Sequence, residues 1–232
     1  FEASLFEAMS IPLPNSRSSL SVDDYDTILA HLEGKSALAV GPGLGTEPQT
    51  GELVLRLYRE AELPMVVDAD ALNILAARSE LLPDPPAPRI LTPHPGEMAR
   101  LTGTTSAAIQ SDRLQAALDF TRKLNTTSAA VTLVLKGAGT IVCDPGGTWA
   151  VNPAGNPGMA AGGMGDVLTG IIGGLLAQGM EPADAARLGV YVHGCAADRV
   201  AVQRKFGYLA SEVAEAVPSL FTARPGNEQN SI

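Results

Sequence analysis

Short strand-like runs alternate with amphipathic stretches along most of this chain of 232 residues. The runs lie at 36–40, 64–67, 89–92 and 131–135, and each is followed by a residue typical of a turn or a loop site: glycine, aspartate, proline or lysine. Runs of this length with such ends are typical of buried strands. Strands that alternate with helices predict an α/β fold, with a mostly parallel central sheet covered by helices on both faces.

The stretches between these runs have the spacing of helices with one apolar face. We expect helices at 23–32, 51–62, 71–77, 111–124, 165–178, 182–202 and 209–221, and a short helix that ends at Leu101. The turn sequence Asp144-Pro145-Gly146-Gly147 lies between two further runs, 140–143 and 148–151, and predicts a hairpin. Hydrophobic residues make up 45% of the chain, enough for a sizeable core. We therefore expect one domain over residues 1–232.

Charge and composition exclude several classes of partner. The net charge is −9, and no basic run could follow a nucleic-acid backbone or an anionic membrane surface. No apolar run is long enough to cross a membrane, and no signal peptide is visible. Cys143 and Cys195 are far apart and belong to no metal-binding motif, so we expect two buried thiols in a reducing cytoplasm.

The segments that follow the predicted strands carry most of the chemically distinctive residues. They lie at 41–45, 68–73, 92–97, 136–140 and 155–166. In parallel sheets, ligands bind outside the carboxyl ends of the strands. The sequence therefore predicts a ligand site where these five segments converge.

A glycine-rich segment at 152–166 is the strongest of these signals. Five of its glycines lie within eleven residues, immediately before an apolar helix. Glycines let a phosphate approach closely, and the free amides and dipole of a helix start favour its negative charge. Asp166 follows directly, so two interpretations arise: a base that takes a proton from a substrate hydroxyl during phosphoryl transfer, or an ordinary helix N-cap.

The other segments carry weaker signals. Lys136-Gly137-Ala138-Gly139-Thr140 suits nucleotide contact or a plain turn, and it does not match the P-loop. The segment 41–45 suits a tight turn, ligand contact or both. Asp68 and Asp70 could hold Mg²⁺ through water or cap the next helix. His94 lies in a proline-bounded loop that favours ligand contact, whereas His31 and His193 are interpreted as structural.

Two common kinds of catalytic centre are not expected. The sequence has neither a GxSxG nucleophile elbow nor an HExxH zinc motif. Both cysteines are remote from any histidine cluster, so we expect no catalytic thiol and no metal held by the protein itself.

Together, in this order and spacing, these five segments resemble the ADP/ATP-dependent NAD(P)H-hydrate dehydratase family of the ribokinase-like superfamily, over about residues 36–223. The resemblance implies a ribokinase-like hydro-lyase that repairs (S)-NADHX and NADPHX to NADH and NADPH. ADP, or ATP, would be the phosphoryl donor together with Mg²⁺, and ADP would yield AMP and phosphate. The resemblance also implies a homo-oligomer, a tetramer.

The resemblance assigns roles to particular residues. Asp166 would deprotonate the C6 hydroxyl of the hydrated nicotinamide, and Gly43, His94 and Asp166 would contact this substrate. The residues that would bind the nucleotide are Lys136, Gly137, Ala138, Gly139, Thr140, Gly162, Gly163 and Gly165. The amides of 162–165 would stabilise charge on the transferring phosphoryl group.

The sequence departs from the family pattern in two places. Ala161 and Met164 stand where the family usually has threonine. The family also normally begins with a glycine-rich strand-and-helix unit, and residues 7–14 resemble the segment just after it. Two other functions stay open: a small-molecule kinase of the same superfamily, such as a thiazole or hydroxymethylpyrimidine kinase, and a nucleotide-binding module without turnover.

Overall fold

The computed structural model describes residues 8–126 and 131–221. Residues 1–7 and 222–232, which belong to the predicted domain, lie outside the described part. One sheet contains six strands in the order β1-β2-β3-β4-β5-β6. The strands are β1 (Leu38–Val40), β2 (Met65–Val67), β3 (Arg89–Leu91), β4 (Val131–Leu135), β5 (Ile141–Cys143) and β6 (Trp149–Val151).

The sheet is mostly parallel, as the sequence predicts. Strands β1 to β4 pair in parallel, while β5 is antiparallel to both β4 and β6. The predicted hairpin is confirmed at the turn between β5 and β6, where the amide of Gly147 donates to the carbonyl of Asp144. The carboxyl ends of β1, β2, β3, β4 and β6 therefore lie along one edge of the sheet.

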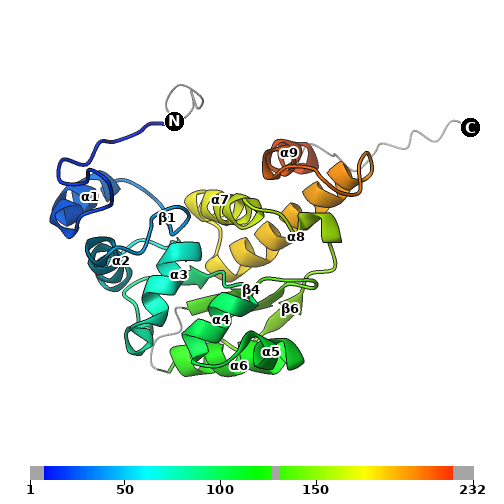
Figure 1. The fold of residues 1–232 in the computed structure, drawn as a ribbon, viewed down its shortest axis with the longest axis horizontal. Coiled ribbons are helices and arrows are strands. Elements are labelled where there is room, and N and C mark those ends of the chain that lie inside the picture. Colours follow the sequence, from blue (N-terminus) through cyan, green and yellow to red (C-terminus); the bar gives the residue numbers. More distant parts are fainter. Residues whose placement is uncertain (1–7, 127–130, 222–232) are drawn as a thin grey trace, which may run out of the picture.

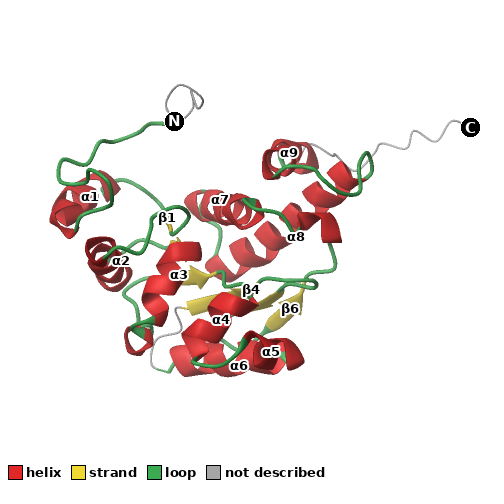
Figure 2. Cartoon of the chain, in the orientation of Figure 1, coloured by secondary structure: helices red, strands yellow, loops and turns green. Residues whose placement is uncertain are grey.

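Helices cover both faces of this sheet (Figures 1 and 2). One face is covered by α2 (Pro48–Glu60), α3 (Ala69–Ala76), α4 (Pro95–Thr102), α5 (Ser106–Ser111) and α6 (Arg113–Leu124), and the other by α7 (Met164–Ala177) and α8 (Pro182–Ala201). The mostly parallel α/β architecture is confirmed.

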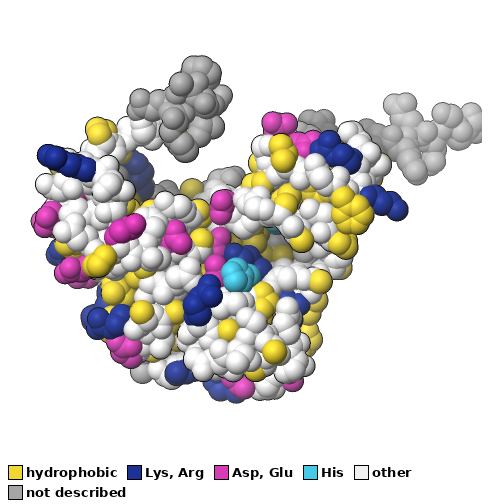
Figure 3. Space-filling view, in the orientation of Figure 1, with side chains coloured by type: hydrophobic (Ala, Val, Ile, Leu, Met, Phe, Trp, Pro, Cys, Tyr) yellow, Lys and Arg dark blue, Asp and Glu magenta, His cyan; other side chains and the backbone are white. Residues whose placement is uncertain are grey.

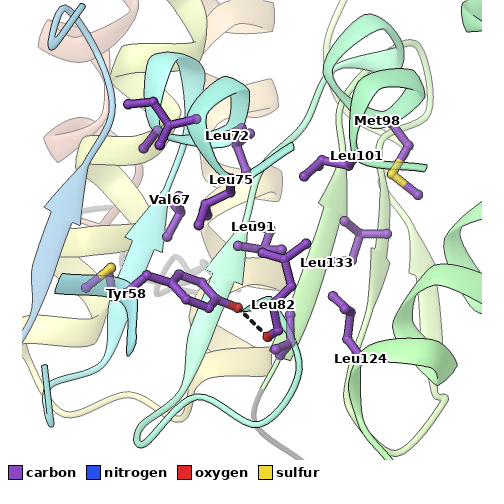
Figure 4. Close-up of a cluster of buried hydrophobic side chains, with 14 of the residues drawn as sticks. Tyr58, Val67, Leu72, Leu75, Leu82, Leu91, Met98, Leu101, Leu124 and Leu133 are labelled. Carbon is purple, nitrogen blue, oxygen red and sulfur yellow. Dashed lines mark hydrogen bonds between the residues drawn. The ribbon is translucent and has the colours of Figure 1, made fainter. Parts of the chain in front are cut away.

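Alternating strand side chains separate two cores, because neighbouring residues in a strand point to opposite faces. Val67 and Leu91 join the core beneath α2 to α6, part of which Figure 4 shows. Val66 and Ile90 join the second core, together with Ile172 of α7. In the first core the buried Tyr58 hydroxyl donates to the Leu82 carbonyl, with 2.8 Å between the oxygens.

The remaining helices are α1 (Tyr25–Leu32), α9 (Ala210–Ala216), α10 (Pro218–Phe221) and the 3-10 turns η1 (Val22–Asp24), η2 (Ser79–Leu81) and η3 (Pro157–Met159). Most predicted helices match within about three residues, but two of them are each divided into two helices. The helix predicted at 111–124 begins at Arg113, because the Asp112 side chain caps it, and a separate α5 precedes it. The helix predicted at 209–221 is divided before Pro218, which has no amide hydrogen to continue the α9 ladder.

The two cysteines are both free thiols. Cys143 is buried in β5, and this burial raises the pKa of its thiol to about 11. Cys195 on α8 is only partly buried, so the expectation of two buried thiols is right for Cys143 alone. Within residues 8–126 and 131–221, no helix has the length and apolar character needed to span a membrane.

Candidate active site

A cavity of about 780 Å³ opens at the carboxyl edge of the sheet. This volume lies within the range of about 300–1,000 Å³ typical of small-molecule sites. The segments after β2, β3, β4 and β6 line it, together with the start of α7 and one side of α8. Figure 3 shows histidine, acidic and basic side chains gathered in this hollow. The predicted convergence is therefore present for four of the five segments, while no residue of 41–45 is among those that line the cavity.

Asp166 lies on the cavity wall in the first turn of α7. The N-cap of α7 is Gly163, in the left-handed conformation with φ of 83°, so the interpretation of Asp166 as an N-cap is wrong. The Asp166 side chain is exposed, and it has no hydrogen bond or ion pair with any described residue. Its carboxylate is therefore free to accept a proton from a ligand in the cavity.

The first turn of α7, which carries this carboxylate, also contains free backbone amides. The first amide bonded within α7 is that of Val167, which donates to the Gly163 carbonyl over 3.0 Å. The three preceding helical amides lie at the positive end of the helix and have no partner in the described part of the chain. Gly162, Met164 and Gly165 line the cavity, whereas Gly163 does not. This arrangement suits a phosphate group beside Asp166.

Hydrogen bonds to α8 hold the glycine-rich segment in place. The Asp198 carboxylate accepts from the Gly155 amide at 2.8 Å and from the Asn156 side-chain nitrogen at 2.9 Å. The Asn156 side-chain oxygen accepts in turn from the Tyr208 hydroxyl at 2.7 Å. Gly158 packs so closely that an added Cβ would lie 2.6 Å from the Lys205 carbonyl oxygen. These contacts fix the wall that leads to α7.

The predicted nucleotide segment 136–140 lines the cavity along its whole length. Arg113 of α6 holds this segment through hydrogen bonds to its backbone. The Arg113 guanidinium donates to the Ala138 carbonyl at 2.5 Å and to the Leu135 carbonyl at 3.0 Å. Gly137 allows this approach, since an added Cβ would lie 2.9 Å from Arg113 Nη2. Sequence reasoning missed Arg113, because a lone arginine at a helix start gives no signal of a distant loop.

The Asp68 side chain does not cap α3, so that interpretation is wrong, while a contact with Mg²⁺ through water stays a prediction. Asp68 occupies the N-cap position of α3 without a capping hydrogen bond. Its buried carboxylate instead accepts from Lys136 Nζ at 2.5 Å and from the Thr169 hydroxyl at 2.9 Å. Glu97 Oε2 lies 3.8 Å from the same ammonium. Lys136 is therefore held between two carboxylates at the cavity.

Asp70 and the segment 41–45 form a turn beside the site. Asp70 Oδ2 accepts from the Gly45 amide at 2.9 Å, and the Leu44 amide donates to the Gly41 carbonyl at 3.3 Å. Gly43, a predicted substrate contact, is not among the residues that line the cavity. In the described part of the chain, no group of three His, Cys, Asp or Glu residues could hold a metal ion. Asp70 therefore fixes a loop, and its contact with Mg²⁺ through water stays a prediction.

His94 lines the cavity and also caps α4. Its Nδ1 accepts from the amides of Gly96 at 2.9 Å and Glu97 at 3.3 Å, so the proton of the neutral ring belongs on Nε2. Half of the His94 side chain is exposed, and Nε2 lies 3.4 Å from Glu97 Oε1. This histidine can therefore contact a ligand while it holds the start of α4.

His193 also lines the cavity, although the sequence suggested a purely structural residue. It lies on α8 with 6% of its surface exposed, and its Nε2 has no hydrogen-bond partner. Burial, with a smaller contribution from nearby Lys136, lowers the pKa of His193 to about 4. The imidazole is therefore neutral at physiological pH. His31 is exposed on α1 and is not among the residues that line the cavity.

The sheet, its two helical layers and the cavity at its carboxyl edge define a ribokinase-like α/β protein. Ribokinase from Arabidopsis thaliana shares the fold at 18% identity, with a TM-score of 0.56 over 91% of this chain and 62% of that one. The sequence profile of the NAD(P)H-hydrate dehydratase family matches residues 3–219, and the chain belongs to that family.

Individual relatives agree with this assignment. A bifunctional NAD(P)H-hydrate repair enzyme of Moorella thermoacetica is 49% identical over 85% of this chain, which spans 37% of that protein. An ADP-dependent (S)-NAD(P)H-hydrate dehydratase of Neisseria meningitidis is 45% identical over 85% of this chain and 66% of its own length. The ADP/ATP-dependent NAD(P)H-hydrate dehydratase of Bacillus subtilis, co-crystallised with ATP and Mg²⁺, has a TM-score of 0.70 at 34% identity, over 80% of this chain and 63% of that one.

Proposed function

We propose that this chain is an ADP-dependent (S)-NAD(P)H-hydrate dehydratase, a hydro-lyase that restores NADH and NADPH from NADHX and NADPHX. The printed names of the Neisseria and Bacillus relatives support this reaction. The observation that carries the proposal is the exposed, unpaired carboxylate of Asp166, which shares a cavity with the free amides of the α7 start. A base and a phosphate site in one cavity are what phosphoryl transfer to a hydroxyl requires.

The proposed reaction has two stages. Asp166 takes the proton of the C6 hydroxyl while that oxygen attacks the terminal phosphorus of ADP; an oxygen–phosphorus bond forms, and the bond to AMP breaks. The lone pair of the ring nitrogen then expels phosphate from C6, and loss of a proton from C5 restores the dihydropyridine. Phosphorylation converts hydroxide, a poor leaving group, into phosphate.

The described residues divide the cavity between two ligands in this proposal. Segment 136–140, Gly162 and Gly165 bind the nucleotide, while His94 and Asp166 contact the hydrated nicotinamide. Gly43 and Gly163 do not line the cavity, so their roles rest on family resemblance alone. Mg²⁺ suits the nucleotide phosphates, because the described residues offer no cluster of ligands for it.

We also propose that residues 1–232 form one catalytic domain that acts in the cytoplasm as a homo-tetramer. The resemblance to the family supports this proposal. Size-exclusion chromatography with light scattering measures the oligomeric state, and a monomer would contradict the tetramer.

The test of the function is direct. Purified protein is incubated with (S)-NADHX and ADP or ATP, and the absorbance of the reduced nicotinamide is followed together with phosphate and AMP. We expect equal amounts of NADH, phosphate and AMP with ADP. No recovery of absorbance with either nucleotide contradicts the proposal. A stable phosphorylated product without phosphate release indicates a kinase instead.

A further inference from the structure

We propose that Asp68 is a positioning residue for Lys136, which it holds against the first turn of α7 so that the ammonium faces the terminal phosphate of the nucleotide. This inference rests on the proposed function for the identity of the nucleotide. Asp68 is among the residues that line the cavity, but only 1% of its side chain is exposed and both of its oxygens already accept hydrogen bonds, so it acts through Lys136 and not by contact with the ligand.

The backbone around Asp68 restricts the orientation of this carboxylate. Ala69 has φ of 48°, a left-handed conformation that side-chain-bearing residues rarely adopt and that clusters at functional sites. Gly41, at the end of β1, packs so tightly that an added Cβ would collide with the Asp68 carbonyl oxygen. The main chain of Asp68 therefore has little freedom.

Both oxygens of the Asp68 carboxylate have a donor. Oδ1 accepts from Lys136 Nζ at 2.5 Å, and Oδ2 accepts from the Thr169 hydroxyl at 2.9 Å. Thr169 lies on α7, 101 residues away in sequence, and is itself buried. The carboxylate thus joins the carboxyl ends of β2 and β4 to α7, with a fixed orientation.

The ammonium of Lys136 consequently lies beside the proposed phosphate site. A Cβ added to Gly165 would lie 3.3 Å from Lys136 Nζ and 3.4 Å from Asp68 Oδ2. The Lys136 side chain retains 18% exposure and lines the cavity, so it can also reach a ligand. An ammonium has three donors, and one bond to Asp68 leaves two for phosphate oxygens. Without Asp68, Lys136 would turn towards Glu97 or solvent.

The experiment is a double-mutant cycle on ADP affinity, measured by calorimetry with the full chain. We expect Lys136→Met and Asp68→Asn each to weaken ADP binding by about 10-fold or more, and the double variant to bind within about 3-fold of Lys136→Met. In turnover assays, Asp68→Asn should change the same kinetic constant as Lys136→Met does, whether that is a higher KM for ADP or a lower kcat. If Asp68 had a purely structural role, the double variant would instead lose ADP affinity by the product of the two single losses.

Asp144→Asn is the matched control. Asp144 forms a partly buried ion pair with Arg187, with 2.6 Å between Asp144 Oδ2 and Arg187 Nη2, and it does not line the cavity. This variant should have a lower melting temperature but bind ADP within about 2-fold of wild type.

If Asp68→Asn does not fold, Thr169→Val replaces it in the experiment. Thr169→Val removes one hydrogen bond to Asp68 with little change of shape, and it should weaken ADP binding by about 3-fold.

The outcomes separate this inference from the proposed function. Wild-type protein that binds ADP without dehydrating NADHX overturns the proposed function, while the binding cycle still decides the role of Asp68. Asp68→Asn with wild-type ADP affinity, or losses that multiply in the double variant, overturn the inference. Wild-type protein that does not bind ADP overturns both.

Discussion

The Asp198 carboxylate accepts a hydrogen bond from the Gly155 amide, with 2.8 Å between Asp198 Oδ2 and Gly155 N. The two residues are 43 positions apart, and this bond ties the glycine-rich segment to α8. The glycines of this segment contribute no side chains to packing, so polar contacts such as this one and the Asn156–Tyr208 hydrogen bond hold it in place. The Asp198 carboxylate is therefore one of the groups that order the wall around the proposed phosphate site.

Asp198→Ala tests this dependence. We expect the free energy of unfolding to fall by about 2 kcal/mol, because two donors lose a charged acceptor, and ADP affinity to fall several-fold. Urea denaturation and calorimetry measure the two effects. Asp198→Asn keeps one acceptor oxygen, so its stability and its ADP affinity should lie between those of wild type and Asp198→Ala. An alanine variant with wild-type stability and affinity would contradict this role.

Two glycines of α7 allow a comparison of the same substitution inside and outside the site. Gly170→Ala should raise the free energy of unfolding by about 0.5–1 kcal/mol and leave ADP affinity unchanged, because nothing lies within 4 Å of the added Cβ and alanine favours a helix. Gly165→Ala should keep the fold but weaken ADP binding by about 10-fold or more, since its Cβ presses on Lys136 and enters the cavity. Equal ADP affinities of the two variants would place the nucleotide away from Gly165.

His193 should make the protein less stable in acid. Its folded pKa of about 4 lies below its ordinary value of 6.5, so the unfolded chain binds the proton first as pH falls. Stability is therefore lost progressively from pH 6.5 down to about 4, by up to about 3 kcal/mol. Urea denaturation of wild type and His193→Gln at pH 7.5 and 4.5 isolates this contribution. The variant should lose less stability, and identical losses would show that His193 does not titrate in this way.

Asp166→Asn should separate catalysis from binding. We expect kcat for NADHX dehydration to fall by about 10³-fold, because the amide cannot accept the hydroxyl proton. The melting temperature and ADP affinity should stay close to wild type, since the Asp166 carboxylate has no partner among the described residues. Asp184→Asn, which changes an exposed acid of α8 that does not line the cavity, is the control and should keep full activity. Unchanged turnover in Asp166→Asn would show that another group is the base, and no measurable turnover in either protein would favour a nucleotide-binding module.

Much of the fold follows from local pattern. The strand over residues 131–135 has the predicted bounds, because a short run rich in valine and leucine that ends at Lys136 is typical of a buried strand. The five loops could be placed at one edge because parallel strands end together. The boundary between α5 and α6 could not be predicted, since it depends on one capping side chain, Asp112.

The site was only partly predictable, because side-chain pairing across the sheet leaves no trace in local sequence. Asp68 precedes a helix, so capping was the natural expectation, yet its partners are 68 and 101 residues away. His193 lies in a helix among small and apolar residues, where periodicity indicates burial but not which cavity the ring adjoins. Arg89 is fully buried without a carboxylate and donates to backbone carbonyls such as that of Ala61, which no motif signals.

The location of the terminal phosphate of bound ADP is the most direct test of the account. A crystal structure of the protein with ADP should place this group within about 2.7–3.1 Å of amides in segment 162–165, with the Asp166 carboxylate facing it across the cavity. A terminal phosphate bound elsewhere, with Asp166 turned away from it, would contradict the proposed phosphoryl transfer.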